Sequence, residues 1–141
     1  MMQGNDELLI QKQGDLKQLL AKVMVDVPFL PTELLNVMEQ RQIKRYPVYK
    51  KIADGLMHTQ KMMGKGMFKM ALKTFRMPTL ILWGDTDPVF DVRVTKELEE
   101  NIKYTKTVIL NNVGHVPIFE APKESANAYL TFLAEIEARL Q

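Results

Sequence analysis

The stretch TLILWGDTDP at residues 79–88 opens with an almost wholly apolar run and ends in turn-forming residues. A continuous apolar run without alternation is typical of a strand buried on both faces of a parallel sheet. Gly84 supplies a sharp turn, and Pro88 holds the residue before it, Asp87, in an extended conformation. The stretch therefore predicts a strand over residues 79–83, followed by a turn that carries the carboxylate of Asp87.

A second stretch of the same kind, TVILNNVGH, occupies residues 107–115. It predicts a strand over 107–110 followed by His115, and a helix over 91–102 fits between the two strands. Because the carboxyl ends of neighbouring parallel strands meet at one edge of a sheet, we expect Asp87 and His115 to come within reach of each other. An aspartate that accepts the Nδ1–H of a histidine leaves Nε2 free to take a proton. The two stretches predict an acid–base pair in a β-α-β unit.

Each residue of this pair also has a plainer interpretation. An aspartate after a strand is often a turn residue or a helix cap, and a Gly-His dipeptide often lies in a loop. Asp85 and Asp91 are alternative candidates for the acid, but Asp85 lies inside the tight turn and Asp91 is well placed to cap the following helix. Asp87 and His115 follow two successive predicted strands and lie 28 residues apart. This order and spacing favour Asp87 and His115 as a catalytic pair.

The residues before the first strand are predicted to be helical. Asp15 is a candidate cap for a first helix, Thr32 for a second running to about residue 45, and Pro47 fits the start of a third. A Met-rich fourth helix is expected over residues 67–75, and the final helix should begin at Pro122. The chain thus divides into a helical cap lobe, residues 1–75, and a β-α-β-α piece, residues 76–141, with two parallel strands and an α/β fold class.

Two surfaces of the helical lobe have open interpretations. An apolar group after the first helix either lines a tunnel for an acyl chain or is ordinary helix packing; its members are Phe29, Leu30, Leu34, Leu35 and Met38. Lysines at intervals of four would suit an anionic membrane surface, although a solvated helix face is the favoured interpretation. These lysines are Lys61, Lys65, Lys69 and Lys73.

Composition narrows the classes of partner. The chain has 141 residues, a formal net charge of +2, no cysteine and two histidines. So weak a charge does not indicate nucleic acid, and without cysteine there are no disulfides or thiolate chemistry. We expect neither a metal site nor a cofactor. The first residues resemble neither a signal peptide nor a membrane span, so a cytoplasmic location is the default expectation.

The motifs around Asp87 and His115 resemble the C-terminal half of an α/β-hydrolase, in the lipase and esterase branch that carries a helical cap and includes monoacylglycerol-lipase-like proteins. The resemblance is carried by MPTLILWGDTD at residues 77–87, by NVGH at 112–115 and by EAP at 120–122, and covers nearly the whole chain. It implies a partial α/β-hydrolase fold, Asp87 as the acid and His115 as the base of a catalytic triad, and lipid-like ester substrates.

The nucleophile of such a triad is missing from this sequence. The family places its serine in a Gly-x-Ser-x-Gly turn before the acid, but the only serine here is Ser125, which lies after His115, inside a predicted helix and between Glu124 and Ala126. Losing the nucleophile costs about six orders of magnitude in turnover, so we expect the chain alone to be inactive. A non-catalytic lipid- or partner-binding module and a truncated reading frame are the alternatives.

The parent fold would place another strand beside residues 79–83. In this sequence that strand has no counterpart, so one edge of the predicted sheet is bare. Exposed strand edges and apolar helix faces favour pairing with another chain. We therefore expect a homodimer or a larger assembly formed through this edge or through exchanged helices.

Overall fold

The structure is a computed structural model that describes residues 8–140. Its elements in chain order are α1 (Asp15–Val23), α2 (Thr32–Leu72), β1 (Thr79–Gly84), α3 (Val94–Asn101), β2 (Thr105–Leu110), α4 (Pro117–Glu120) and α5 (Pro122–Leu140). The predicted α/β class is confirmed, and α4 is a short helix that the sequence patterns did not predict.

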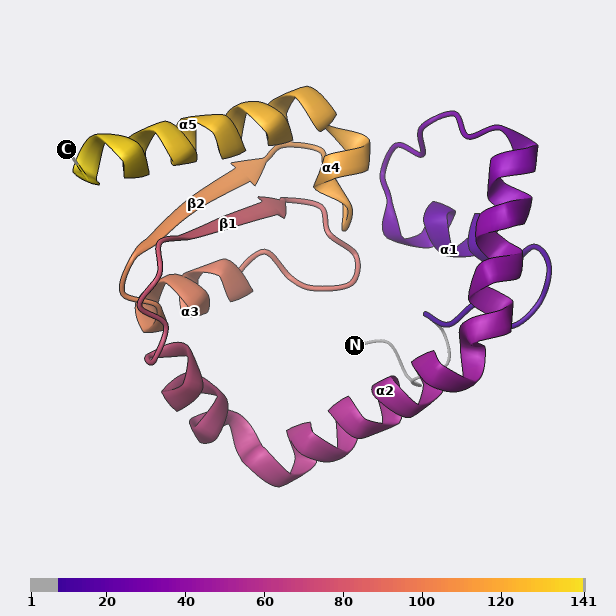
Figure 1. The fold of residues 1–141 in the computed structure, drawn as a ribbon, viewed down its shortest axis with the longest axis horizontal. Helices are drawn as coiled ribbons and strands as arrows, with labels where there is room; N and C mark the ends of the chain where they lie inside the picture. Colours follow the sequence, from indigo (N-terminus) through magenta and orange to yellow (C-terminus); the bar gives the residue numbers. More distant parts are fainter. Residues whose placement is uncertain (1–7, 141) are drawn as a thin grey trace.

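The sheet consists of β1 and β2, which pair in parallel from Thr79 opposite Thr105 to Gly84 opposite Leu110. Helix α5 packs on one side of this pair, and α3, which connects the two strands, lies on the other (Figure 1). The prediction of two parallel strands joined by a helix is therefore confirmed. The prediction that the strands are buried on both faces is wrong: only Ile81 and Gly84 are buried, because two strands with one helix on each side are only partly covered.

Helix α2, residues 32–72, continues through Pro47, so the helix start predicted there is wrong. A kink at Gly64 interrupts α2 ahead of the predicted Met-rich helix, as the separation of that helix from the preceding one implied. Proline lacks a backbone N–H and crowds the preceding turn, yet Pro47 lies inside α2. The departure from helical geometry falls at Gly64, whose φ of 62° and ψ of 168° suit glycine alone. Among residues 8–140, no helix combines the length and the apolar character needed to cross a membrane.

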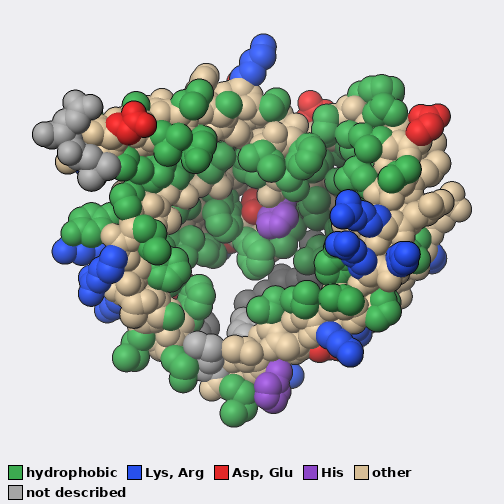
Figure 2. Space-filling model, in the orientation of Figure 1, with side chains coloured by type: hydrophobic (Ala, Val, Ile, Leu, Met, Phe, Trp, Pro, Cys, Tyr) green, Lys and Arg blue, Asp and Glu red, His purple; other side chains and the backbone are tan. Residues whose placement is uncertain are grey.

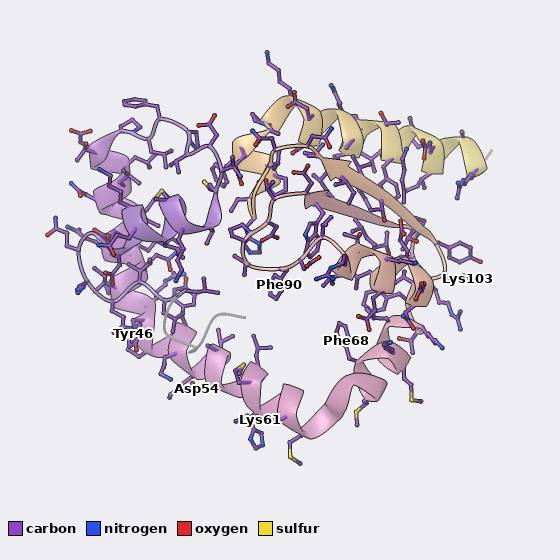
Figure 3. The ribbon with its side chains drawn as sticks, turned by 180° about the vertical axis from the view of Figure 1, so that it is seen from behind. Tyr46, Asp54, Lys61, Phe68, Phe90 and Lys103 are labelled. Carbon is purple, nitrogen blue, oxygen red and sulfur yellow. The ribbon has the colours of Figure 1, made fainter. Side chains whose placement is uncertain are left out.

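The elements surround a hollow. Helix α2 runs from its contact with α1 around to α3, where Lys69 and Glu97 form an ion pair at 3.0 Å (Figure 1). In the space-filling view hydrophobic side chains gather around the hollow centre (Figure 2). Phe68 of α2 and Phe90 of the loop after β1 both lie on its inner side (Figure 3). The carboxyl ends of β1 and β2 point toward α4 and α1 (Figure 1).

Helix α1 is held to α2 by a carboxylate. The side chain of Glu39 is buried and its Oε1 accepts hydrogen bonds from the N–H groups of Gly14, at 2.8 Å, and Leu16, at 2.9 Å. Asp15, the predicted cap, instead accepts from the N–H groups of Gln11 and Lys12. These two contacts lower the pKa of the Asp15 carboxyl, since they favour its charged form. N–H groups at the start of α1 are thus hydrogen-bonded by a side chain of α2.

Candidate active site

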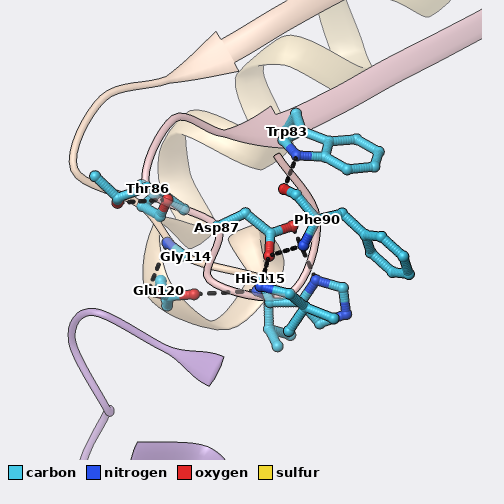
Figure 4. Close-up of polar contacts among 10 residues, drawn as sticks. Trp83, Thr86, Asp87, Phe90, Gly114, His115 and Glu120 are labelled. Atoms are coloured by element: carbon cyan, nitrogen blue, oxygen red, sulfur yellow. Dashed lines mark hydrogen bonds and ion pairs between the residues drawn. The ribbon is translucent and has the colours of Figure 1, made fainter. Parts of the chain in front are cut away.

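The loops after β1 and β2 bring Asp87 and His115 together. Nδ1 of His115 lies 2.9 Å from Oδ2 of Asp87 (Figure 4). The Asp87 side chain is 4% exposed and the His115 side chain 35% exposed. The carboxylate is therefore enclosed, while the imidazole keeps part of its surface accessible. A neutral imidazole that donates from Nδ1 to this carboxylate carries its lone pair on Nε2.

The second oxygen of Asp87 shapes the loop in which it lies. Oδ1 accepts hydrogen bonds from the N–H groups of Val89, at 2.7 Å, and Phe90, at 3.0 Å. The Phe90 carbonyl in turn accepts from Nε1 of Trp83 at 3.4 Å, and the Phe90 ring centroid lies 5.8 Å from that of His115. One oxygen thus orders the loop while the other faces His115.

The loop carrying His115 is fixed against the end of β1. Both N–H and Oγ1 of Thr86 donate to the carbonyl of Val113, at 3.1 Å and 2.9 Å. A Cβ on Gly84 would lie 2.1 Å from this same oxygen, so only glycine allows the approach. The N–H of His115 donates to the Val23 carbonyl at 2.8 Å. The two loops are consequently in backbone contact as well as side-chain contact.

The two alternative acids form other contacts. Asp85 accepts from the N–H of Asn112 at 2.7 Å. Asp91 accepts from both the N–H and the guanidinium of Arg93, and these bonds lower its pKa to about 2. Helix α3 begins at Val94, so Asp91 lies ahead of its first turn rather than at its N-cap. Of the three aspartates, Asp87 is the one whose carboxylate contacts His115.

The five apolar residues considered for substrate binding do not form one buried group. Phe29 is 91% exposed and Leu34 is also exposed, while Leu30, Leu35 and Met38 are half-buried. Ordinary helix packing does not account for Leu34, because α2 turns the face that carries Glu39 toward α1. Leu35, Met38 and Glu39 share this face at helical spacing. Among residues 8–140, no group of three or more His, Cys, Asp or Glu side chains could hold a metal ion.

The patterns missed two carboxylates that organise the structure. Glu120 accepts from the N–H groups of Gly114, at 2.9 Å, and Val116, at 3.1 Å, on either side of His115. Glu39 holds the start of α1. The sequence pattern predicts that Glu39 and Glu120 are ordinary polar residues of a helix. Their hydrogen-bond partners lie outside the helices that carry them. For Glu120, the one available signal was its place in the EAP motif.

Comparisons with known proteins agree with this geometry. No family model matches the chain. The chain is 31% identical to Lipase 3 of Moraxella sp. (strain TA144) over 133 residues, which cover 91% of the chain and 39% of that lipase. It is 23% identical to the monoacylglycerol lipase ABHD6 of Bos taurus, covering 96% of the chain and 45% of the relative. The chain spans less than half the length of these curated relatives.

A solved structure gives the same result. The crystal structure of lip1 from Acinetobacter baumannii AYE superimposes with a TM-score of 0.89 at 38% identity, covering 95% of this chain and 45% of that one. The fold and these relatives define an α/β-hydrolase. The chain belongs to the α/β-hydrolase family, and its relatives there are lipases, including monoacylglycerol lipases.

Proposed function

We propose that this chain supplies the acid and the base of a carboxylic-ester hydrolase, with Asp87 as the acid and His115 as the base. The observation that carries the proposal is the 2.9 Å contact between His115 Nδ1 and Asp87 Oδ2, in which the carboxylate is enclosed and the imidazole partly exposed. Such an arrangement sets the imidazole tautomer that can accept a proton at Nε2. The sequence similarity to lipases supports an ester of a lipid as the substrate class.

In this proposal His115 Nε2 removes the proton of an attacking serine hydroxyl as that oxygen bonds to the ester carbon. The same proton then passes to the leaving alcohol oxygen as the ester bond breaks. A water molecule repeats the sequence on the acyl-enzyme, releasing the acid and restoring the serine. Asp87 remains ionised throughout, where it orients the imidazole and stabilises its protonated form.

The attacking serine is proposed to come from polypeptide outside these 141 residues. Ser125 is 5% exposed, and its Oγ donates to the Pro117 carbonyl at 2.9 Å. Buried in α5 and held by this bond, its hydroxyl lacks the exposed turn that a nucleophile of this family occupies. We therefore expect the chain alone to turn over no ester.

A non-catalytic lipid- or partner-binding module is the second candidate. It is favoured by the exposed Phe29 and by exposed apolar side chains along α2, which include Val48, Ile52, Leu56, Met62, Met67 and Phe68. Binding of a fatty acid without turnover, in the presence of a serine-bearing half, would favour this candidate.

A homo-oligomer is a further part of the proposal. Within residues 8–140, β1 pairs only with β2, and Tyr129 and Leu130 of α5 are exposed. An open strand edge beside apolar surface favours association. Sedimentation of the chain at micromolar concentration should give a dimer or larger species, and a compact stable monomer would contradict this.

A chimera tests the catalytic proposal. The part of Moraxella Lipase 3 that the chain does not match is fused to, or co-expressed with, this chain, and hydrolysis of p-nitrophenyl esters with four-, eight- and twelve-carbon acyl groups is measured. We expect turnover from the chimera, none from the chain alone, and loss of turnover with His115→Ala in the chimera. Equal turnover by the His115→Ala chimera would exclude His115 as the base.

A further inference from the structure

Glu120 receives backbone hydrogen bonds from two segments far apart in the sequence. Its carboxylate accepts from Gly114 and Val116 in the loop of His115. It also accepts from the N–H groups of Val25, at 2.7 Å, and Asp26, at 3.5 Å. Val25 and Asp26 belong to residues 23–26, named here the connecting segment. It starts at the last residue of α1 and leads toward α2, which begins at Thr32. One carboxylate therefore ties the base-bearing loop to the helical lobe.

The backbone of His115 completes this junction. The N–H of His115 donates to the Val23 carbonyl at 2.8 Å. The connecting segment therefore accepts a hydrogen bond from His115 and donates hydrogen bonds to Glu120. Gly114 is buried, and a Cβ there would lie 2.7 Å from the Val23 oxygen and 3.0 Å from both Glu120 carboxylate oxygens. The residues before and after His115 are thus both bonded to Glu120, and His115 itself is bonded to the connecting segment.

The position of Glu120 follows from α4. Val116 precedes this one-turn helix and Pro117 opens it, so that its last residue, Glu120, points back at the loop it has just left (Figure 4). The Pro117 carbonyl accepts from Oγ of Ser125 in α5, which anchors the turn. The turn that carries Glu120 is therefore anchored to α5, while its carboxylate bonds to both the connecting segment and the loop of His115 and can transmit a displacement from one to the other.

We propose that Glu120 is a positioning residue that couples the connecting segment, and through it the start of α2, to the His115 imidazole. The inference rests on the proposed function, because it assigns His115 the role of base. The bond from Asp87 fixes one end of the imidazole, and the bonds to Glu120 fix the backbone from which the ring projects. A carboxylate suits this role because it has only acceptor atoms, whereas an amide would turn one N–H toward the N–H groups of the junction.

Amide hydrogen exchange and nitrogen NMR of the His115 ring, both on the full chain, test the coupling. In Glu120→Gln we expect the amides of Gly114, Val116 and Val25 to exchange about tenfold faster or more, and to do so together. The fraction of His115 in the Nδ1–H tautomer should fall. Glu120→Asp, which keeps the charge on a shorter side chain, should give an intermediate result. Glu124→Gln, an exposed carboxylate on α5, is the matched control and should change neither readout.

Three results would overturn the coupling. Faster exchange at Gly114 and Val116 with Val25 still protected would confine Glu120 to its own loop. An unchanged tautomer would remove its effect on the imidazole. Lost protection at the sheet amides of Ile81 and Val108 in both Glu120 variants would assign it to general stability. These readouts do not require turnover, so an inactive chimera would count against the proposed function and leave this inference standing.

Discussion

Gly84, the last residue of β1, approaches Val113 so closely that a Cβ on the glycine would lie 2.1 Å from the Val113 carbonyl oxygen. The same oxygen accepts two hydrogen bonds from Thr86, so the end of one strand and the loop after the other are packed backbone to backbone. Asp87 and His115 lie on the two sides of this contact. The short distance between their side chains depends on the absence of a side chain at position 84.

Gly84→Ala should be strongly destabilising. Because the clash is with backbone atoms that side-chain rotation cannot relieve, we expect the free energy of unfolding to fall by about 3 kcal/mol or more. Gly55→Ala is the control, since no heavy atom lies within 4 Å of a Cβ at that position of α2; alanine there should add up to about 1 kcal/mol. Urea denaturation followed by Trp83 fluorescence measures both, and equal midpoints for the two variants would contradict the expectation.

Asp87→Asn should reduce kcat/KM of the chimera by about four orders of magnitude, the loss seen when a triad aspartate is replaced by its amide. The amide can donate toward Nδ1 and so favours the tautomer with its proton on Nε2. Asp91→Asn tests the rival acid. Because Asp91 contacts Arg93 rather than His115, this variant should keep activity within about threefold. Similar losses in both variants would argue against Asp87 as the acid.

Glu39→Ala should loosen α1 from α2. The substitution removes the acceptor for the N–H groups of Gly14 and Leu16, the second of which is buried, and we expect a cost of about 1–3 kcal/mol in the free energy of unfolding. Glu39→Gln keeps an oxygen at that position and should retain most of the stability. Gln40→Ala, on the exposed side of α2, serves as control. If Glu39→Gln cost as much as Glu39→Ala, the charge rather than the acceptor oxygen would be the stabilising feature.

The contact of Asp91 with Arg93 predicts a pH dependence. The guanidinium and the N–H of Arg93 lower the pKa of Asp91 from 3.8 to about 2. Since this folded-state pKa lies below the ordinary one, the contact stabilises the folded chain above about pH 4, and its contribution is lost as the pH falls through about 2. Carbon NMR of the Asp91 carboxyl measures the titration. Arg93→Ala should shift it upward, toward 3.8, and Arg76→Ala should not. An unshifted titration in Arg93→Ala would refute this cause.

The two strands, their parallel pairing and the proximity of Asp87 and His115 could all be predicted from the order of the amino acids. The signals for these features are contiguous in the chain: an apolar run, a turn glycine and a polar residue at the strand's carboxyl end. Parallel strands joined by one helix place those ends side by side. Local chemistry and connectivity were sufficient for that part of the site.

The hydrogen bonds that support the site could not be predicted before the folded chain was seen. Glu120 and Val25 are 95 positions apart, and the partners of Glu39 lie 23 and 25 positions away from it. Because these partners are distant in the chain, no local sequence pattern predicts the hydrogen bonds. The continuity of α2 through Pro47 could not be predicted from the sequence either, because proline is favoured at the first position of a helix. A carboxylate whose partners are backbone N–H groups leaves no side-chain signature in those partners. Their identity is fixed only when folding brings the segments together.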